Sequence, residues 1–229
     1  MPTLAQIVND NPNAARVLER HRLDYCCGGR QTLESACEAG GVDIEVVLQD
    51  LAAQPTAEGD WVNLGIAELV DHIESTHHRY LHEELPRLVA LATKVRDVHS
   101  ERHPELTEVA RVVTALHHEL EPHMLKEEQV LFPMIRELAA SEGVPSFHCG
   151  SLANPIRVML VEHDQAGELL DELRTLTGDH QPPADACGSY KALYSGIEQV
   201  EADTHLHVHK ENNLLFPTVI DVEHRRSAP

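Results

Sequence analysis

The sequence has little positive charge and no long apolar run. Of its 229 residues, 18 are lysine or arginine and 38 are aspartate or glutamate, which gives a formal net charge of -20. A surface of this charge repels phosphate backbones and anionic membranes, so we expect neither nucleic acid nor a membrane as a partner. The amino-terminal segment shows no basic stretch followed by an apolar one. These features predict a cytoplasmic globular protein.

Cysteine is also sparse, and strand-like alternation of apolar and polar residues is almost absent. The five cysteines form an odd set and are too few for a secreted disulfide scaffold, so reduced thiols are predicted. Four long segments instead show helical periodicity, which predicts an all-α fold built around an up-down-up-down four-helix bundle. We place this bundle at residues 61–223 and its helices near 64–97, 105–139, 154–176 and 187–221.

The first quarter of the chain has a different pattern. Short helical segments alternate there with turn signals, which are an asparagine followed by proline and two pairs of adjacent glycines. Residues 52–60 combine proline, glycine and acidic residues without periodicity, which is typical of a linker. We therefore predict a small helical domain at residues 1–57, ahead of the bundle.

Histidine, by contrast, is abundant, with seventeen residues. Imidazole is the commonest metal ligand in proteins, and it is also the side chain that titrates near neutral pH. A metal site or a pH sensor is therefore the first kind of function to consider.

A repeated motif indicates a metal site. Residues 123–134 and 207–218 share the pattern H-x-x-K-E-x-x-x-L-F-P, with their histidines 84 positions apart. Two further histidines, His78 and His163, each stand on the helical segment that precedes one copy of the motif, and they lie 85 positions apart. A duplicated helical hairpin explains both spacings. It predicts one site with six ligands, which are His78, His123, Glu127, His163, His207 and Glu211.

The helical period places these six groups in the core. A histidine and a glutamate four positions apart share one helix face, and here they interrupt apolar rows that include Val130 and Leu160. Each buried polar group without a partner costs about 1 to 3 kcal/mol, and a bound metal removes that cost. Mixed imidazole and carboxylate ligands suit iron, manganese or zinc better than copper(I) or calcium. Two shared glutamates and four terminal imidazoles predict a pair of ions about 3.5 to 4 Å apart.

Several other titratable residues stand close to the predicted ligands. His82 follows His78 by four positions, so it could be a fifth imidazole or line an access path. Glu119 and Glu162 either carry protons or iron, or orient the imidazoles. Six histidines besides His82 also lack a repeat partner, and we expect most of them on the surface. The six are His72, His77, His117, His118, His205 and His209.

The repeat with its L-F-P ending resembles the hemerythrin-like family of di-iron bundles. Residues 24–34, DYCCGGRQTLE, resemble the amino-terminal signature of the iron-sulfur cluster repair di-iron proteins, the repair of iron centres family. The segments HMLKEEQVLFPMI, EHDQAGELL and ENNLLFP resemble the same family. This resemblance implies a non-haem di-iron site with the six ligands above, a cytoplasmic homodimer, and damaged iron-sulfur proteins as partners. It also implies repair of clusters damaged by oxidative or nitrosative stress.

Cys26 and Cys27 are followed by two glycines, which permit the close approach of another molecule. The thiols could deliver or receive iron, bind a cluster transiently with Cys37, or exchange with a client thiol. A buried structural pair is the alternative.

Three functions remain open for the bundle. They are supply of iron to damaged clusters, reduction of nitric oxide at the two irons, and reversible binding of oxygen or nitric oxide as a sensor. The attached cysteine pair favours repair over simple ligand carriage.

Overall fold

The structure is a computed structural model that describes residues 1–57 and 59–227. Helices form nearly all of its regular structure, and no β-strand occurs in these ranges, so the predicted all-α class is confirmed. Within the same ranges, every helix is too short or too polar to cross a membrane. The predicted linker includes residue 58, which lies outside the described residues.

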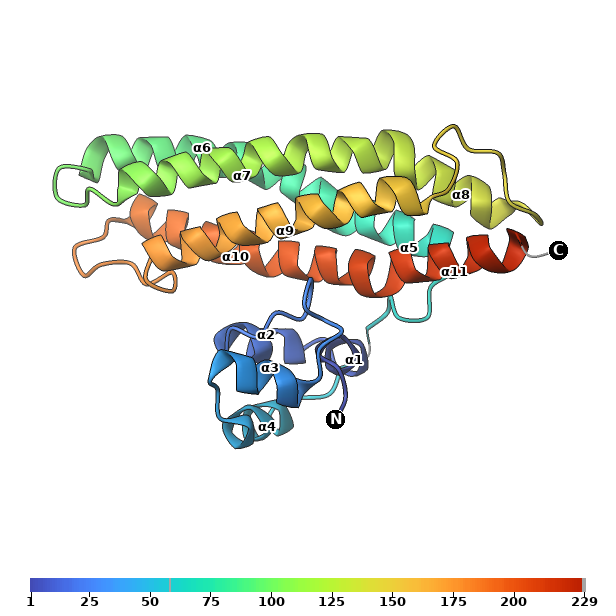
Figure 1. Cartoon of the computed structure of the whole chain (residues 1–229). Helices are drawn as coiled ribbons and strands as arrows, with labels where there is room; N and C mark the ends of the chain where they lie inside the picture. The colour runs from blue at the N-terminus through green and yellow to red at the C-terminus, as the bar shows by residue number, and fades with distance from the viewer. Residues whose placement is uncertain (58, 228–229) are drawn as a thin grey trace. The chain divides into compact units, whose positions relative to one another are not determined.

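The four predicted long helices are present, with ends shifted by a few residues, and three of them contain a π-helical turn. Such turns insert one extra residue into an α-helix and occur frequently at functional sites. In chain order (Figure 1), the elements are α5 (Ile66–Ile73), η1 (Glu74–His78), α6 (Arg79–His99), α7 (Leu106–Lys126), η2 (Glu127–Leu131), α8 (Phe132–Ala140), α9 (Ala153–Leu176), α10 (Gly188–Lys210), η3 (Glu211–Leu215) and α11 (Phe216–Ser227).

The chain folds as two units, and one of them comprises residues 74–133 and 157–204. This unit contains α6, α7, most of α9 and the longer part of α10. Its core takes buried side chains from all four helices, among them Leu85, Leu116 and Leu193. Within this unit the four helices therefore pack around one shared apolar core.

Two predicted core positions are wrong. Val130 is 41% exposed and Leu160 is 37% exposed. Val130 lies inside η2, where the extra residue of the π turn shifts the helical phase, so that Leu131 is buried in its place. On α9 the inward-facing residue before His163 comes four positions earlier, and Met159 is buried there.

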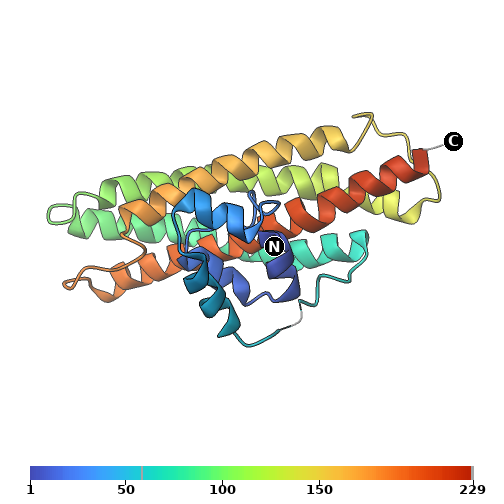
Figure 2. The ribbon, with the colours of Figure 1, turned by 60° about the horizontal axis from the view of Figure 1, so that its bottom comes forward.

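The other unit comprises residues 1–73, residues 134–156 and the chain from His205 onward. Its first four helices form one cluster in both views (Figures 1 and 2), and we call them the amino-terminal module. The module consists of α1 (Leu4–Asp10), α2 (Ala14–Arg20), α3 (Leu33–Gly40) and α4 (Ile44–Ala52).

Side-chain caps fix where three of the four helices of the module begin, and α2 begins without one. Thr3 forms a capping box with Gln6 at the start of α1, and Thr32 and Asp43 cap α3 and α4. The apolar core of the module includes Val208, which belongs to α10 of the same unit. The helix that carries the second copy of the repeated motif therefore also helps to build the core of the module.

Candidate metal centre

Glu127 opens the π turn η2, and its carboxylate is fully buried. Neither of its oxygens has a hydrogen-bond partner among the described residues. The Nε2 atoms of His78 and His123 each lie 3.4 Å from its Oε2. A buried carboxylate without hydrogen bonds is costly, and a cation held between it and the two ring nitrogens removes that cost. These residues therefore fit a metal ion.

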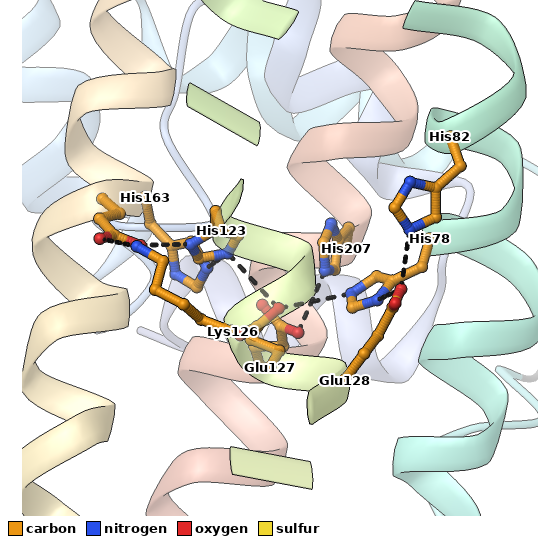
Figure 3. Close-up of polar contacts among 10 residues, drawn as sticks. His78, His82, His123, Lys126, Glu127, Glu128, His163 and His207 are labelled. Carbon is orange, nitrogen blue, oxygen red and sulfur yellow. Dashed lines mark hydrogen bonds and ion pairs between the residues drawn. The ribbon is translucent and has the colours of Figure 1, made fainter. Parts of the chain in front are cut away.

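Two carboxylates orient these imidazoles. His78 Nδ1 lies 2.9 Å from Glu128 Oε1 (Figure 3). His123 Nδ1 lies 2.9 Å from Glu162 Oε2. Because an ionised carboxylate only accepts hydrogen bonds, each Nδ1 carries the proton and donates it. The lone pair of a neutral ring then lies on Nε2, the nitrogen that faces Glu127.

The remaining predicted ligands show similar geometry. His163 Nε2 lies 3.1 Å from His123 Nε2, so these two ring nitrogens point at each other. In the second copy of the motif, His207 Nε2 lies 3.1 Å from Glu211 Oε1, and both side chains are fully buried. Glu211 opens η3 in the same way as Glu127 opens η2.

The six predicted ligands are all buried, and they form two groups by the unit to which they belong. His78, His123, Glu127 and His163 belong to one unit, and His207 and Glu211 belong to the other. Each group combines imidazole with a carboxylate, which is a donor set that suits a cation such as iron.

Glu162 is the carboxylate on the outer side of His123. It also accepts a hydrogen bond from Lys126. Partial burial raises the pKa of Glu162, but the hydrogen bonds from Lys126 and His123 outweigh burial and hold the pKa below its ordinary value. Glu162 is therefore ionised at neutral pH and suited to orienting an imidazole. Glu119, predicted for a similar role, is exposed on α7.

His82 lies outside both groups of predicted ligands. Its Nε2 is 2.9 Å from Glu128 Oε1, and its Nδ1 is 3.1 Å from Glu121 Oε2. Burial lowers the pKa of His82, but its two carboxylate partners outweigh burial and raise the pKa above its ordinary value. Glu128 thus contacts both His78 and His82, as Figure 3 shows.

Cys26 and Cys27 are free thiols in a loop that wraps around Asp24. The Asp24 carboxylate accepts the backbone N–H groups of Cys26, Cys27 and Gly28 at 2.8 to 2.9 Å, and the Cys26 thiol lies 3.1 Å from it. A Cβ at position 28 would lie 2.7 Å from the Asp24 carbonyl oxygen, so the loop requires glycine there. Cys26 is buried, whereas Cys27 is partly exposed.

The surroundings also make the two thiols chemically different. A hydrogen bond with Cys27, burial and the negative charge of Asp24 all hold the pKa of Cys26 well above its ordinary value. Cys26 therefore remains a thiol at neutral pH. Cys27 is the more exposed of the two thiols, so it is the one that another molecule can reach.

The cysteine loop packs against η3 and the end of α10, in the same unit. The Asn213 side-chain amide donates to the carbonyl oxygens of Cys26 at 2.9 Å and Tyr25 at 3.3 Å. His209 Nδ1 lies 3.2 Å from the Tyr25 carbonyl oxygen, and the two rings meet edge to face. His209 is one of the six histidines of which most were expected on the surface, and it does not follow that expectation. Its side chain is buried among these contacts, and burial lowers its pKa to about 4.

His77 is a second member of that set that does not lie on the surface. His77 is buried, and its Nδ1 lies 2.9 Å from Asp203 Oδ1. Glu128, which the sequence did not single out, contacts a predicted ligand. The repeat offered one sign of it. The two copies differ at the position after the shared glutamate, which is Glu128 in the first copy and Asn212 in the second.

The chain matches two family models. Residues 69–219 match the hemerythrin HHE cation-binding domain, and residues 2–54 match a domain of unknown function, DUF542. The match to a cation-binding domain and the cluster of histidines and glutamates together indicate that this part of the chain binds metal.

The chain is also similar to curated proteins over nearly its whole length. It is 39% identical over 219 residues to the iron-sulfur cluster repair protein YtfE of Enterobacter sp. (strain 638), Shigella boydii serotype 4 (strain Sb227) and Escherichia coli O8 (strain IAI1). Each match covers 95% of this chain and 96% of the relative.

Proposed function

Because this chain belongs to the family of the iron-sulfur cluster repair protein YtfE and carries its hemerythrin-like domain, we propose that it repairs damaged iron-sulfur clusters by supplying iron. One observation carries the proposal. Glu127 is a fully buried carboxylate that has no hydrogen bond among the described residues and is faced by two imidazole nitrogens. This is the environment of a metal ligand rather than of a structural glutamate.

Two non-haem iron ions are the proposed cargo. Their proposed ligands are His78, His123, Glu127, His163, His207 and Glu211. Neutral imidazoles supply most of the donors, and the two carboxylates offset part of the positive charge, so iron is held without thiolates. Bound here, the iron supplies a reserve of ions for rebuilding a cluster. Glu128 and Glu162 keep the protons on Nδ1 and thereby direct Nε2 of two imidazoles at the ions.

The cysteine pair is the proposed point of contact with the client, which is a damaged iron-sulfur protein. Cys27 is partly exposed and faces the client's iron, while Cys26 donates its S–H group to Asp24 and stabilises the loop. A role of Glu119 in proton or iron transfer, a cytoplasmic location and a homodimer remain predictions of the same hypothesis.

The test is reactivation of a cluster enzyme that has been inactivated with nitric oxide. We expect the iron-loaded protein to restore activity under anaerobic conditions, and we expect Glu127→Leu to abolish both iron retention and reactivation. Glu137→Leu is the matched control, because Glu137 is an exposed glutamate on α8. Equal reactivation by Glu127→Leu and by the unchanged protein would contradict iron supply from this site.

Two other outcomes distinguish the alternatives. Catalytic formation of nitrous oxide from nitric oxide and a reductant, faster than any loss of iron, would replace iron supply with nitric oxide reduction. A stable and reversible adduct of oxygen or nitric oxide, with unchanged iron content and no reactivation of the damaged enzyme, would identify the protein as a sensor.

A further inference from the structure

Iron supply from a buried site requires a path through the bundle. Moving a divalent cation through apolar side chains is strongly unfavourable, because the ion loses its hydration shell without replacement. The path must therefore be lined by side chains that can ligate iron at each step. In proteins these are imidazoles and carboxylates that are close enough to exchange the ion between them.

One series of contacts leads from a proposed ligand to the surface. His78 contacts Glu128 at 2.9 Å, and Glu128 contacts His82 at 2.9 Å through the same oxygen. His82 in turn contacts Glu121 at 3.1 Å, and Glu121 lies 3.9 Å from His117 Nε2.

Exposure rises along this series as far as Glu121. The side chain of His78 is 1% exposed, those of Glu128, His82 and Glu121 are 27%, 29% and 38% exposed, and that of His117 at the end is 24% exposed. Imidazole and carboxylate alternate at every step, from the buried ligand to solvent. Beyond His78, whose Nδ1 carries a proton, each neighbouring pair brings one ring nitrogen close to one carboxylate oxygen, at 2.9, 3.1 and 3.9 Å in turn.

The other flank of the site ends differently. His123 contacts Glu162, but the next partner of Glu162 is Lys126. A lysine ammonium carries a positive charge at neutral pH and has no lone pair for a metal. It therefore repels iron and cannot pass it on, whereas the imidazole of His82 can exchange a proton for a metal ion. The two flanks differ in charge and in ligand chemistry.

We propose that Glu128, His82, Glu121 and His117 form a ligand-lined route by which divalent iron reaches and leaves the metal centre at His78. Iron moves along it as Fe²⁺ by ligand exchange, with no change of oxidation state. The inference rests on the proposed function, because it names the path for the iron that the function supplies. The counterparts of Glu128 and His82 in the second hairpin are Asn212 and Gly167, so the duplication did not preserve the route there.

The test compares the rates of iron loading and iron release. The full-length protein is loaded anaerobically with Fe²⁺, and transfer to the ferrous chelator ferrozine is followed by absorbance. For the double variant Glu121→Gln with His117→Gln, we expect both loading and release to be about tenfold slower, which corresponds to about 1.4 kcal/mol in barrier height. Iron content and affinity at equilibrium should stay the same, because a route changes both directions equally.

Two exposed neighbours supply matched controls. Glu83→Gln and His118→Gln change the same residue types beside the route, and both should load and release iron at the rate of the unchanged protein. Wild-type rates in the double variant would overturn the route. A change in affinity with unequal effects on loading and release would also overturn it, because that pattern indicates a purely structural role.

Failure of the route and failure of the proposed function give different results. Normal iron release by the double variant, together with reactivation that depends on Glu127, would contradict the proposed route but not the repair function. Slow iron release by the double variant, with no reactivation of damaged enzyme by any form of the protein, would contradict the repair function and support the route.

Discussion

The first copy of the repeated motif, at residues 123–134, and the second, at residues 207–218, place a histidine and a glutamate alike but differ in the residues beside them. After the shared glutamate, the first copy has Glu128, which contacts two imidazoles. The second copy has Asn212 and Asn213 in the corresponding turn, and their amides face the cysteine loop. The residues that follow the shared glutamate thus orient a proposed ligand, His78, in the first copy, and they contact the cysteine loop in the second.

The residue two positions before the shared glutamate differs in the same way. It is Leu125 in the first copy and is exposed, whereas in the second copy it is His209, which is buried under Tyr25. The residue type at this position fits the surroundings of each copy, which are solvent for Leu125 and the cysteine loop for His209.

We expect the largest loss of stability at the π turns η2 and η3, which both copies contain and which shift the phase of the helix. Leu131 and Leu215 are buried at the end of η2 and η3, and Val130 is exposed one position before Leu131. Leu131→Ala and Leu215→Ala should each lower the free energy of unfolding by about 2 to 5 kcal/mol. Val130→Ala should change it by less than about 0.5 kcal/mol. Urea unfolding measures these differences, and equal losses at positions 130 and 131 would show a continuous α-helix instead.

We expect an intermediate effect, on metal affinity, at the position after the shared glutamate, where the two copies have different residues. Glu128→Gln removes the negative charge that accepts the Nδ1 proton of His78, so metal affinity should fall by about 10- to 100-fold. Asn212→Gln, at the corresponding position of the second copy, should leave affinity nearly unchanged. Competition titrations with a chelator measure both. A similar loss of metal affinity in the two variants would contradict the idea that this position orients an imidazole in the first copy alone.

The smallest effect is expected at the cysteine loop. Asn213→Ala removes two hydrogen bonds to loop carbonyls, a net loss of about 1 to 2 kcal/mol, so alkylation of Cys27 by iodoacetamide should become about 5- to 30-fold faster. Gln129→Ala, the same change in the first copy, should have no effect on that rate. Mass spectrometry of the labelled protein measures both rates. An unchanged rate in Asn213→Ala would show that Asn213 does not restrain the loop.

The helix positions and the proposed ligands could be predicted because they depend on local periodicity and on a duplication visible in the chain. Histidine and glutamate four apart share a face whatever the rest of the molecule does. The errors occurred where local periodicity changes. The π turn altered the phase after Glu127, so Val130 was assigned to the core in place of Leu131. No residue pattern marked that insertion in advance.

The all-α class and the six proposed ligands were predicted from composition, a 3.6-residue period and a repeat, all of which can be read along the chain. The contact of Glu128 with His78, the burial of His209 and the different exposure of Cys26 and Cys27 are known from the folded molecule alone. Hydrogen bonding and burial depend on which helices and loops pack together, and the sequence pattern does not show this. Those contacts join residues up to 200 positions apart, as between Asn9 and His209.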